Sequence, residues 1–227
     1  MEKLLIENQF AELSQKYSGL HLSETTDEDY PFIINGSLLF EVIDEKYPIA
    51  ADTFDLEIKI SKYHPLILPK VSETTNRIPR IDKYHINSGG TFCLASRRKE
   101  HELFCKLPSL LGFTENLIIP FLYSFSCYAK YSIRPYGELS HGSQGLLEDY
   151  KKLLGVSSKK EVCDFLIYLQ SMYKNPKKRA RIRTRERCPC GSKLRFNRCH
   201  KRYDEMKNYY PELYLSQDIE DIKNSSS

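Results

Sequence analysis

Two groups of residues in this chain have the types and spacing that chemistry needs. One is Cys93, which follows a pair of glycines, and the other is a C-terminal cluster of three cysteines and a histidine. The chain holds seven cysteines, an odd number, and they are not spread as a disulfide framework would be. In a reducing compartment this arrangement indicates catalysis or metal binding rather than cross-linking.

Cys93 lies in an irregular segment, residues 77–94, rich in residues with special roles. A thiol is the best side-chain carrier of an acyl group, because its thiolate attacks readily and the thioester stays reactive toward amines. Asn87 could donate its amide to the oxyanion that forms when an amine attacks. Gly89 and Gly90 permit a tight turn ahead of the nucleophile. The segment therefore predicts a catalytic cysteine.

Two histidines are candidates for supporting roles. His85 is predicted to order the loop through hydrogen bonds of its side chain. His141 could deprotonate the attacking amine or the thiol if the chain folds back toward Cys93. A structural histidine beside a turn glycine is an equally good interpretation of His141. The other scattered cysteines are expected to be small buried hydrophobic residues: Cys105, Cys127 and Cys163.

The C-terminal cluster has the pattern Cys-x-Cys, eight residues, then Cys-His. Three thiolates and one imidazole can close a tetrahedral zinc site and leave no open coordination position, so the metal is expected to be structural. Without metal so short a segment buries too little apolar surface to fold. The predicted zinc ligands are Cys188, Cys190, Cys199 and His200.

Charge is distributed unevenly along the chain. The net charge is +4, yet residues 174–202 hold 13 Lys or Arg and one acidic residue, so the remainder is acidic. Two charge regimes predict two modules, with a boundary near residue 175. The basic run, residues 177–187, could contact nucleic acid or an acidic protein face, or be a solvated linker. Nucleic-acid binding is not the favoured interpretation.

Hydrophobic periodicity predicts an α+β domain: an amphipathic helix, four strands, an irregular loop and then helices. Residues 53–60 give the clearest strand, because apolar and charged residues alternate along it. No apolar run approaches the roughly 20 residues that a bilayer crossing needs, and acidic residues interrupt the N-terminus where a signal peptide is apolar. A cytoplasmic protein with no membrane segment is expected. The expected strands are 19–23, 32–43, 53–60 and 64–71, and the expected helices are 3–17, 114–128, 143–154 and 158–169. Ser158 and Glu161 have the spacing of a capping box, which predicts the start of the last of these helices.

The loop resembles the active site of ubiquitin-conjugating enzymes, in which a His-Pro-Asn triplet precedes a glycine turn and Cys-Leu. This chain has Ile86 in place of the proline, and Asn87 precedes Cys93 by six positions, two fewer than is usual in the eukaryotic enzymes. The order of elements over roughly residues 1–170 is similar too. The resemblance implies the UBC-like fold, with an N-terminal helix, a four-stranded antiparallel meander and C-terminal helices.

The segment from Tyr136 to Gly145 resembles the His-Gly signature of conjugating enzymes from bacterial cyclic-oligonucleotide antiphage (CBASS) operons. The resemblance implies antiviral defence, with a donor protein ending in glycine that is a cyclic-oligonucleotide synthase or a ubiquitin-like protein. It also implies a lysine-bearing target and, in some operons, an activating enzyme. This chain shows no nucleotide-binding glycine loop, so adenylation is expected to occur elsewhere.

The cysteine cluster resembles the SEC-C motif, a short zinc module associated with docking to protein partners. The predicted organisation is a catalytic domain, a basic linker, a zinc module and an acidic, polar tail, at residues 1–172, 173–187, 188–213 and 214–227 respectively.

We therefore expect a ubiquitin-conjugating-like transferase that carries a protein C-terminus as a thioester on Cys93 and transfers it to a lysine amine. The alternative is a catalytically inactive UBC-fold scaffold whose basic zinc segment binds nucleic acid or a protein partner. A cysteine peptidase is disfavoured, because nothing in the sequence places a general base near Cys93 as such enzymes require.

Overall fold

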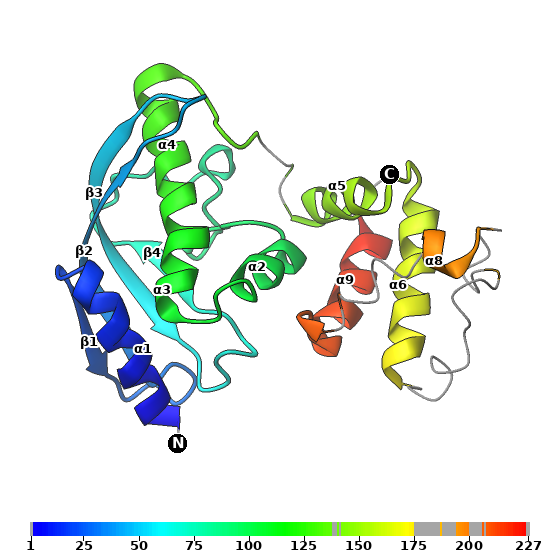
Figure 1. The fold of residues 1–227 in the computed structure, drawn as a ribbon, viewed down its shortest axis with the longest axis horizontal. Helices are drawn as coiled ribbons and strands as arrows, with labels where there is room; N and C mark the ends of the chain where they lie inside the picture. Colours follow the sequence, from blue (N-terminus) through cyan, green and yellow to red (C-terminus); the bar gives the residue numbers. More distant parts are fainter. Residues whose placement is uncertain are drawn as a thin grey trace. The chain divides into compact units, whose positions relative to one another are not determined.

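The chain forms two compact units in a computed structural model (Figure 1). The first unit comprises residues 1–95 and 103–138, and the second comprises residues 96–102 and 139–227. The polypeptide thus enters the second unit briefly, returns to the first, and enters the second again. The structure describes residues 2–137, 140, 142–174, 187, 194–199, 206 and 208–225.

The first unit is built on an antiparallel sheet with strand order β1-β2-β3-β4. Along β3, residues Phe54, Leu56, Ile58 and Ile60 are buried while the residues between them are more accessible, which confirms the predicted alternation. Pairing of Phe32 with Ile60 fixes the register of the long β2–β3 ladder. The strands are β1 (Leu20–Glu24), β2 (Phe32–Val42), β3 (Ala50–Ile60) and β4 (Lys70–Glu73).

Helices cover one face of this sheet and complete the first core. Figure 1 shows α4 running along the sheet and α1 beside β1. The helical run starts at Ser109, whose hydroxyl accepts a hydrogen bond from the Gly112 amide at 3.0 Å. The elements are α1 (Glu2–Lys16), α3 (Leu110–Phe113), the π-helical turn η2 (Thr114–Ile118) and α4 (Ile119–Tyr131).

Among the described residues one helical run, Leu110–Tyr131, is long and apolar enough to cross a membrane by length and composition. More than half of it is buried inside the protein, as in the core helix of any globular unit, so it is weak evidence for a membrane span.

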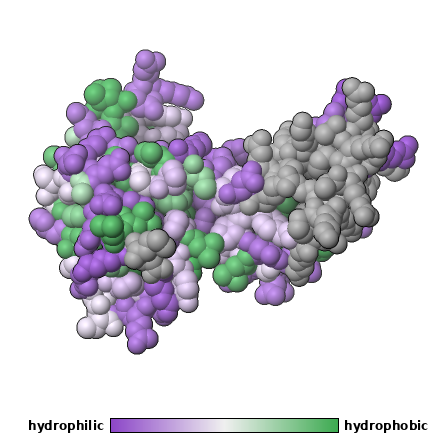
Figure 2. All heavy atoms as spheres, turned by 60° about the horizontal axis from the view of Figure 1, so that its bottom comes forward, coloured by the Kyte–Doolittle hydropathy of each residue, from purple (hydrophilic) through white to green (hydrophobic). Residues whose placement is uncertain are grey.

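Figure 2 shows one face of the molecule, where the coloured surface is mostly hydrophilic and the apolar side chains form small separate groups.

The second unit is helical and has its own apolar core. The capping box predicted at Ser158 is confirmed: the Ser158 hydroxyl accepts from the Glu161 amide at 3.2 Å, and the Glu161 carboxylate accepts from the Ser158 amide at 3.2 Å. Its helices are α5 (Gly142–Leu154), α6 (Lys159–Lys174), α8 (Phe196–Cys199) and α9 (Glu212–Asn224). Helix α2 (Arg97–Phe104) starts in this unit, and its last two residues belong to the first unit.

These units divide the chain differently from the predicted organisation. The expected boundary at residue 172 lies inside α6, and residues 214–224, expected to be polar tail, form most of α9. Helix α9 buries Leu215, Ile219 and Ile222 in the core that it shares with α5 and α6. The cysteine cluster therefore lies within the sequence of the second unit, between two of its core helices.

The expected α+β class, with an N-terminal helix, a four-stranded antiparallel meander and later helices, is confirmed. The predicted zinc module lies mostly outside the described residues.

His64 is a buried titratable group in the first unit. Its side chain is 8% exposed, its ring packs edge-on against Phe104 with centroids 5.8 Å apart, and its Nε2 atom lies 3.4 Å from the Gln9 side-chain oxygen. Burial lowers the pKa of His64 to about 4. The imidazole is therefore neutral in the folded unit at neutral pH.

We predict that the first unit loses stability as pH falls from about 6.5 to about 4. In that range the unfolded chain protonates His64 and the folded unit does not, so the cost approaches about 3 kcal/mol. His64→Leu should flatten this loss, whereas His21→Gln, at an exposed position on β1, should keep it. Hydrogen exchange of the β2 and β3 amides measures the stability of the first unit. This measurement avoids interference from His101, whose pKa is also lowered to about 4. An unchanged acid dependence in His64→Leu would contradict the assignment.

Candidate active site around Cys93

A buried carboxylate fixes the start of the loop that leads to Cys93. Glu73, at the end of β4, is 6% exposed and accepts hydrogen bonds from the amides of Thr75 at 2.7 Å and Arg77 at 2.8 Å. The Arg77 guanidinium in turn binds both carboxylate oxygens of Asp52 on β3, at 2.8 and 2.7 Å. The loop is thus tied to the sheet before it reaches the site.

The chain then makes one turn of 3-10 helix, η1 (Asp82–Tyr84), which ends at His85. His85 has a left-handed backbone conformation with φ 56°, and its amide donates to the Asp82 carbonyl at 2.8 Å. This conformation is uncommon for a residue other than glycine, and it reverses the chain toward the turn that precedes the cysteine.

A short hairpin turn carries Asn87 and leads into Cys93. Ile86 and Phe92 form an antiparallel bridge, and the Asn87 amide donates to the Thr91 carbonyl at 2.8 Å. The Gly90 amide donates to the Asn87 carbonyl at 2.8 Å, and Gly90 has φ 81°. Gly89 does not have a positive φ, so only the second glycine of the pair is required by the backbone.

Cys93 is half-buried and its backbone is held directly by His85. The Cys93 amide donates to the His85 carbonyl at 2.8 Å, and the preceding Phe92 amide donates to the Val71 carbonyl of β4 at 2.7 Å. The Cys93 sulfur lies 3.9 Å from the Ala95 carbonyl oxygen. His85 therefore orders the cysteine through its main chain.

The Asn87 side chain lies one peptide unit away from the cysteine. Its Nδ2 atom donates to the Thr91 hydroxyl at 3.0 Å and lies 3.4 Å from the Phe92 carbonyl oxygen, which belongs to the peptide joining Phe92 to Cys93. The structure thus brings together three of the predicted site residues, Cys93, Asn87 and His85. The fourth, His141, lies outside the described residues.

Cations that the sequence analysis did not single out flank the same loop. Lys83 Nζ lies 5.2 Å and the Arg134 guanidinium carbon 4.0 Å from the centroid of the Tyr128 ring, and Arg134 also donates to the Lys83 carbonyl at 3.1 Å. A hydrogen bond from Lys83 is the main cause of the lowered pKa of Tyr128. This side of the loop is electropositive and suited to an acidic partner surface. The signal in the sequence was the recurrence of Lys and Arg through residues 77–83.

The structure describes only a small part of the predicted zinc site. In the part of the chain that the structure describes, no group of three or more His, Cys, Asp or Glu side chains could hold a metal. Of the predicted ligands only Cys199, the last residue of α8, is described. Cys188, Cys190 and His200 lie outside the described residues.

The donor set of the cysteine cluster suits a metal, and the structure describes one backbone contact at its edges. Arg187 pairs with Arg195 in an antiparallel bridge. This bridge places the residue before Cys188 opposite a residue four positions before Cys199. Three thiols and an imidazole are also a donor set that zinc prefers.

Neither a scan against protein-family models nor a search of curated proteins finds a match to this chain. The function is therefore inferred from the geometry of the loop and from the motifs in the sequence.

We predict that Gly90→Ala disturbs the site and Gly89→Ala does not. An alanine at residue 90 would adopt an unfavourable positive φ, and its Cβ would lie 3.4 Å from the Arg80 guanidinium, so the cost should be about 1–3 kcal/mol. A Cβ at Gly89 meets nothing within 4 Å. Unfolding free energies and exchange rates of the Asn87 and Cys93 amides measure the difference. Equal effects of the two substitutions would show that the turn does not need its left-handed residue.

Proposed function

We propose that this protein is a ubiquitin-conjugating-like transferase. It carries the C-terminal acyl group of a donor protein as a thioester on Cys93 and transfers that group to a lysine amine. The observation that carries the proposal is the placement of Cys93 and Asn87 on one glycine turn, with the Asn87 amide directed at the peptide that precedes the cysteine.

The fold and the motif order support the proposal. A helix, a four-stranded antiparallel meander and later helices are consistent with the UBC-like fold, and the Cys93 loop follows the last strand of that meander. The elements His85, Asn87, the glycine turn, Cys93 and Leu94 occur in the order found in the ubiquitin-conjugating active site.

The proposed chemistry has two steps. In the first, the Cys93 thiol loses its proton and its sulfur attacks the activated C-terminal carbonyl of the donor, so that a C–S bond forms and the activating group leaves. In the second, a lysine amine attacks the thioester carbonyl, a tetrahedral oxyanion forms, and the C–S bond breaks to release the Cys93 thiolate. Asn87 would donate its amide to that oxyanion by exchanging one of its two loop contacts. The proton lost by the amine passes to a base, and His141 is the candidate.

The partners and setting follow from the resemblance to antiphage conjugating enzymes. The donor would be a protein ending in glycine, either a cyclic-oligonucleotide synthase or a ubiquitin-like protein. Where the operon encodes a separate activating enzyme, that enzyme would help to charge Cys93. The target would bear a lysine, and the reaction would take place in the bacterial cytoplasm as part of antiviral defence.

The second unit would hold one structural zinc ion. Cys188, Cys190, Cys199 and His200 would bind it, and the metal would stabilise the segment between α6 and α9. The resemblance to the SEC-C motif favours a docking role for this segment, in which it recruits a protein partner of the transferase.

One observation favours a second candidate, a non-catalytic scaffold with the same fold. The Asn87 amide already contacts two acceptors within the loop, which a purely structural asparagine would also do. A scaffold would bind the donor without forming a thioester, and its basic zinc segment would bind a protein partner or nucleic acid. Charging of Cys93 distinguishes the two candidates.

Incubation with a donor, ATP and an activating enzyme should give a thiol-sensitive adduct that Cys93→Ala abolishes. Asn87→Ala should still be charged but should discharge onto amines roughly 100-fold more slowly, because the oxyanion loses a donor. The matched control is Ser88→Ala, an exposed neighbour in the same turn, which should discharge at the wild-type rate. A thiol-sensitive adduct on Cys93→Ala would place the nucleophile elsewhere, and wild-type discharge by Asn87→Ala would leave that residue structural.

Elemental analysis should find one zinc ion per chain, and Cys188→Ser or Cys199→Ser should remove it. Because the predicted site is closed, chelation should not change the rate at which Cys93 is charged. Cys163→Ser is the control, since this cysteine lies on α6 against the second core and is not a predicted ligand. Zinc retained by both ligand variants would contradict the site.

A further inference from the structure

The surface around the Cys93 loop is basic, although the first unit as a whole is acidic. This unit has 12 Lys or Arg and 17 Asp or Glu. Residues 74–95 and 128–137, which form the loop and the end of α4 that contacts it, together have five basic residues and one acidic residue, Asp82. The positive charge of the unit is therefore concentrated around the candidate nucleophile.

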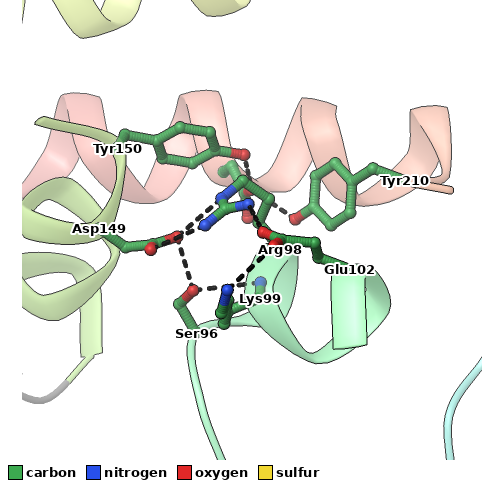
Figure 3. Close-up of polar contacts among 8 residues, drawn as sticks. Ser96, Arg98, Lys99, Glu102, Asp149, Tyr150 and Tyr210 are labelled. Carbon is green, nitrogen blue, oxygen red and sulfur yellow. Dashed lines mark hydrogen bonds and ion pairs between the residues drawn. The ribbon is translucent and has the colours of Figure 1, made fainter. Parts of the chain in front are cut away.

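Arginines that take part in the fold are bound by carboxylates. In the second unit Arg98 is 2% exposed, and it binds both oxygens of Asp149 at 2.8 Å and Glu102 at 2.6 Å (Figure 3). In the first unit Arg77 binds both oxygens of Asp52. A guanidinium that a carboxylate binds in this bidentate way has its charge matched within the protein.

Arg80 and Lys83 are used differently. Both residues are exposed, and none of the carboxylates that the structure describes forms an ion pair with either of them. The Arg80 guanidinium lies beside the glycine turn, 3.4 Å from the point that a Cβ on Gly90 would occupy. A hydrogen bond to Tyr128 is the main cause of a raised pKa of Lys83, so this side chain carries its charge at neutral pH. Two positive charges at the loop are thus open to a partner.

Aromatic rings order the positive charge on this surface. The Tyr128 ring packs edge-on against Tyr84 with centroids 6.1 Å apart, and Tyr84 packs against Phe125 at 5.5 Å. The Arg134 guanidinium lies 4.0 Å from the centroid of the Tyr128 ring and donates to the Lys83 carbonyl at 3.1 Å. A partner therefore meets cations that are already held in place, which lowers the entropic cost of binding.

These cations are close enough to contact a chain that is attached to the thiol. The Cys93 amide binds the His85 carbonyl at 2.8 Å, and Lys83 is two residues before His85, so its main chain lies within about 10 Å of Cys93. Gly90, beside Arg80, is three residues from Cys93 and lies within about 11 Å of it. An extended acyl chain advances about 3.3 Å per residue, so side chains about two to five positions before its terminal glycine can contact the cations.

We propose that Arg80, Lys83 and Arg134 form a subsite for an acidic peptide. This basic subsite selects donors that carry Asp or Glu about two to five positions before the C-terminal glycine. The inference rests on the proposed transferase function and deepens it by specifying the donor. A carboxylate-bearing tail is attracted to the basic subsite, whereas a tail with Lys or Arg at the same positions is repelled.

The test uses short peptides activated as C-terminal thioesters of N-acetylcysteamine, which charge a cysteine without an activating enzyme. The Cys93 thiolate attacks the thioester carbonyl, a new C–S bond forms, and the N-acetylcysteamine thiolate leaves and takes up a proton. The peptides end in Asp-Glu-Asp-Ala-Gly, Asn-Gln-Asn-Ala-Gly or Lys-Arg-Lys-Ala-Gly. Peptide mass spectrometry measures the initial rate at which Cys93 is acylated.

At low ionic strength the acidic peptide should charge Cys93 about fivefold faster than the neutral one, because each exposed ion pair contributes weakly. In about 1 M salt, where the Debye length falls to about 3 Å, the two rates should become equal. Expressing each rate relative to the neutral peptide cancels any change in the reactivity of the thiol itself.

Substitutions locate the preference. Lys83→Gln and Arg80→Gln should each lower the acidic-to-neutral ratio about twofold, and the double variant Lys83→Glu, Arg80→Glu should prefer the basic peptide. The matched control is Lys3→Gln, which removes the same charge beside Glu24 on β1, at the opposite edge of the sheet from β4. This control should keep the wild-type ratio.

The result for the basic subsite is separate from the result for the transferase. Equal charging by the acidic and neutral peptides, or an acidic preference that survives in the double variant, would overturn the subsite and leave enzymatic charging of Cys93 untouched. A preference that Lys83 and Arg80 control, in a protein whose Cys93 no activated donor protein charges, would uphold the subsite and overturn the transferase.

Binding without chemistry separates a peptide from a nucleic acid. Amide chemical shifts of Lys83 and Gly90 are followed during titration with the unactivated acidic peptide and with an oligothymidylate of similar charge. The acidic peptide should bind more tightly. Tighter binding of the oligothymidylate to these residues would overturn the assignment to an acidic peptide.

Discussion

The hydrogen bond from the Cys93 amide to the His85 carbonyl is the constraint on which the candidate site depends. It closes the loop from His85 to Cys93, and the bond from the adjacent Phe92 to Val71 fixes the same end of that loop to β4. The cysteine therefore leaves the sheet at a defined point. The left-handed residues His85 and Gly90 make this closure possible, because each reverses the chain within one residue. The Asn87 side chain takes its position from the same closed turn.

The second unit shows how buried charge can specify an arrangement. A buried ion pair contributes little net stability, because the cost of removing both charges from water is large, but an unpaired member is strongly unfavourable. Arg97 and Arg98 are each paired, with Asp218 on α9 and Asp149 on α5. Any packing that separated these helices from residues 96–102 would leave buried charges unsatisfied, so the network favours a single arrangement within this unit.

Local signals in the sequence predicted much of the fold. The alternation of apolar and charged residues predicted β3, and the Ser158 capping box predicted the start of α6. Both patterns involve only residues that are close together in the sequence. Helix α9 escaped detection because its three buried residues stand among acidic and polar ones, in a segment that looks like tail. The charge of the sequence does change near residue 175, yet this position lies within one compact unit. Net charge does not determine which helices share a core.

For the site too, the sequence predicted groups of neighbouring residues but not contacts between residues that are far apart along the chain. The sequence identified Cys93, Asn87 and His85, which one turn brings together. It did not show that Gly90 alone needs a positive φ, because two adjacent glycines look equivalent. Nor could it pair Arg98 with Asp149, which are 51 positions apart and resemble ordinary surface charges until both are found buried.

Thioester formation on Cys93 can be tested by recovering the protein from its own cells under acidic, non-reducing conditions and mapping any acyl adduct by mass spectrometry. We expect a protein-derived C-terminal acyl group on Cys93 that reducing agent removes. A free Cys93 thiol in cells where the donor is present and active, or an adduct on another cysteine, would show that Cys93 is not the acyl carrier.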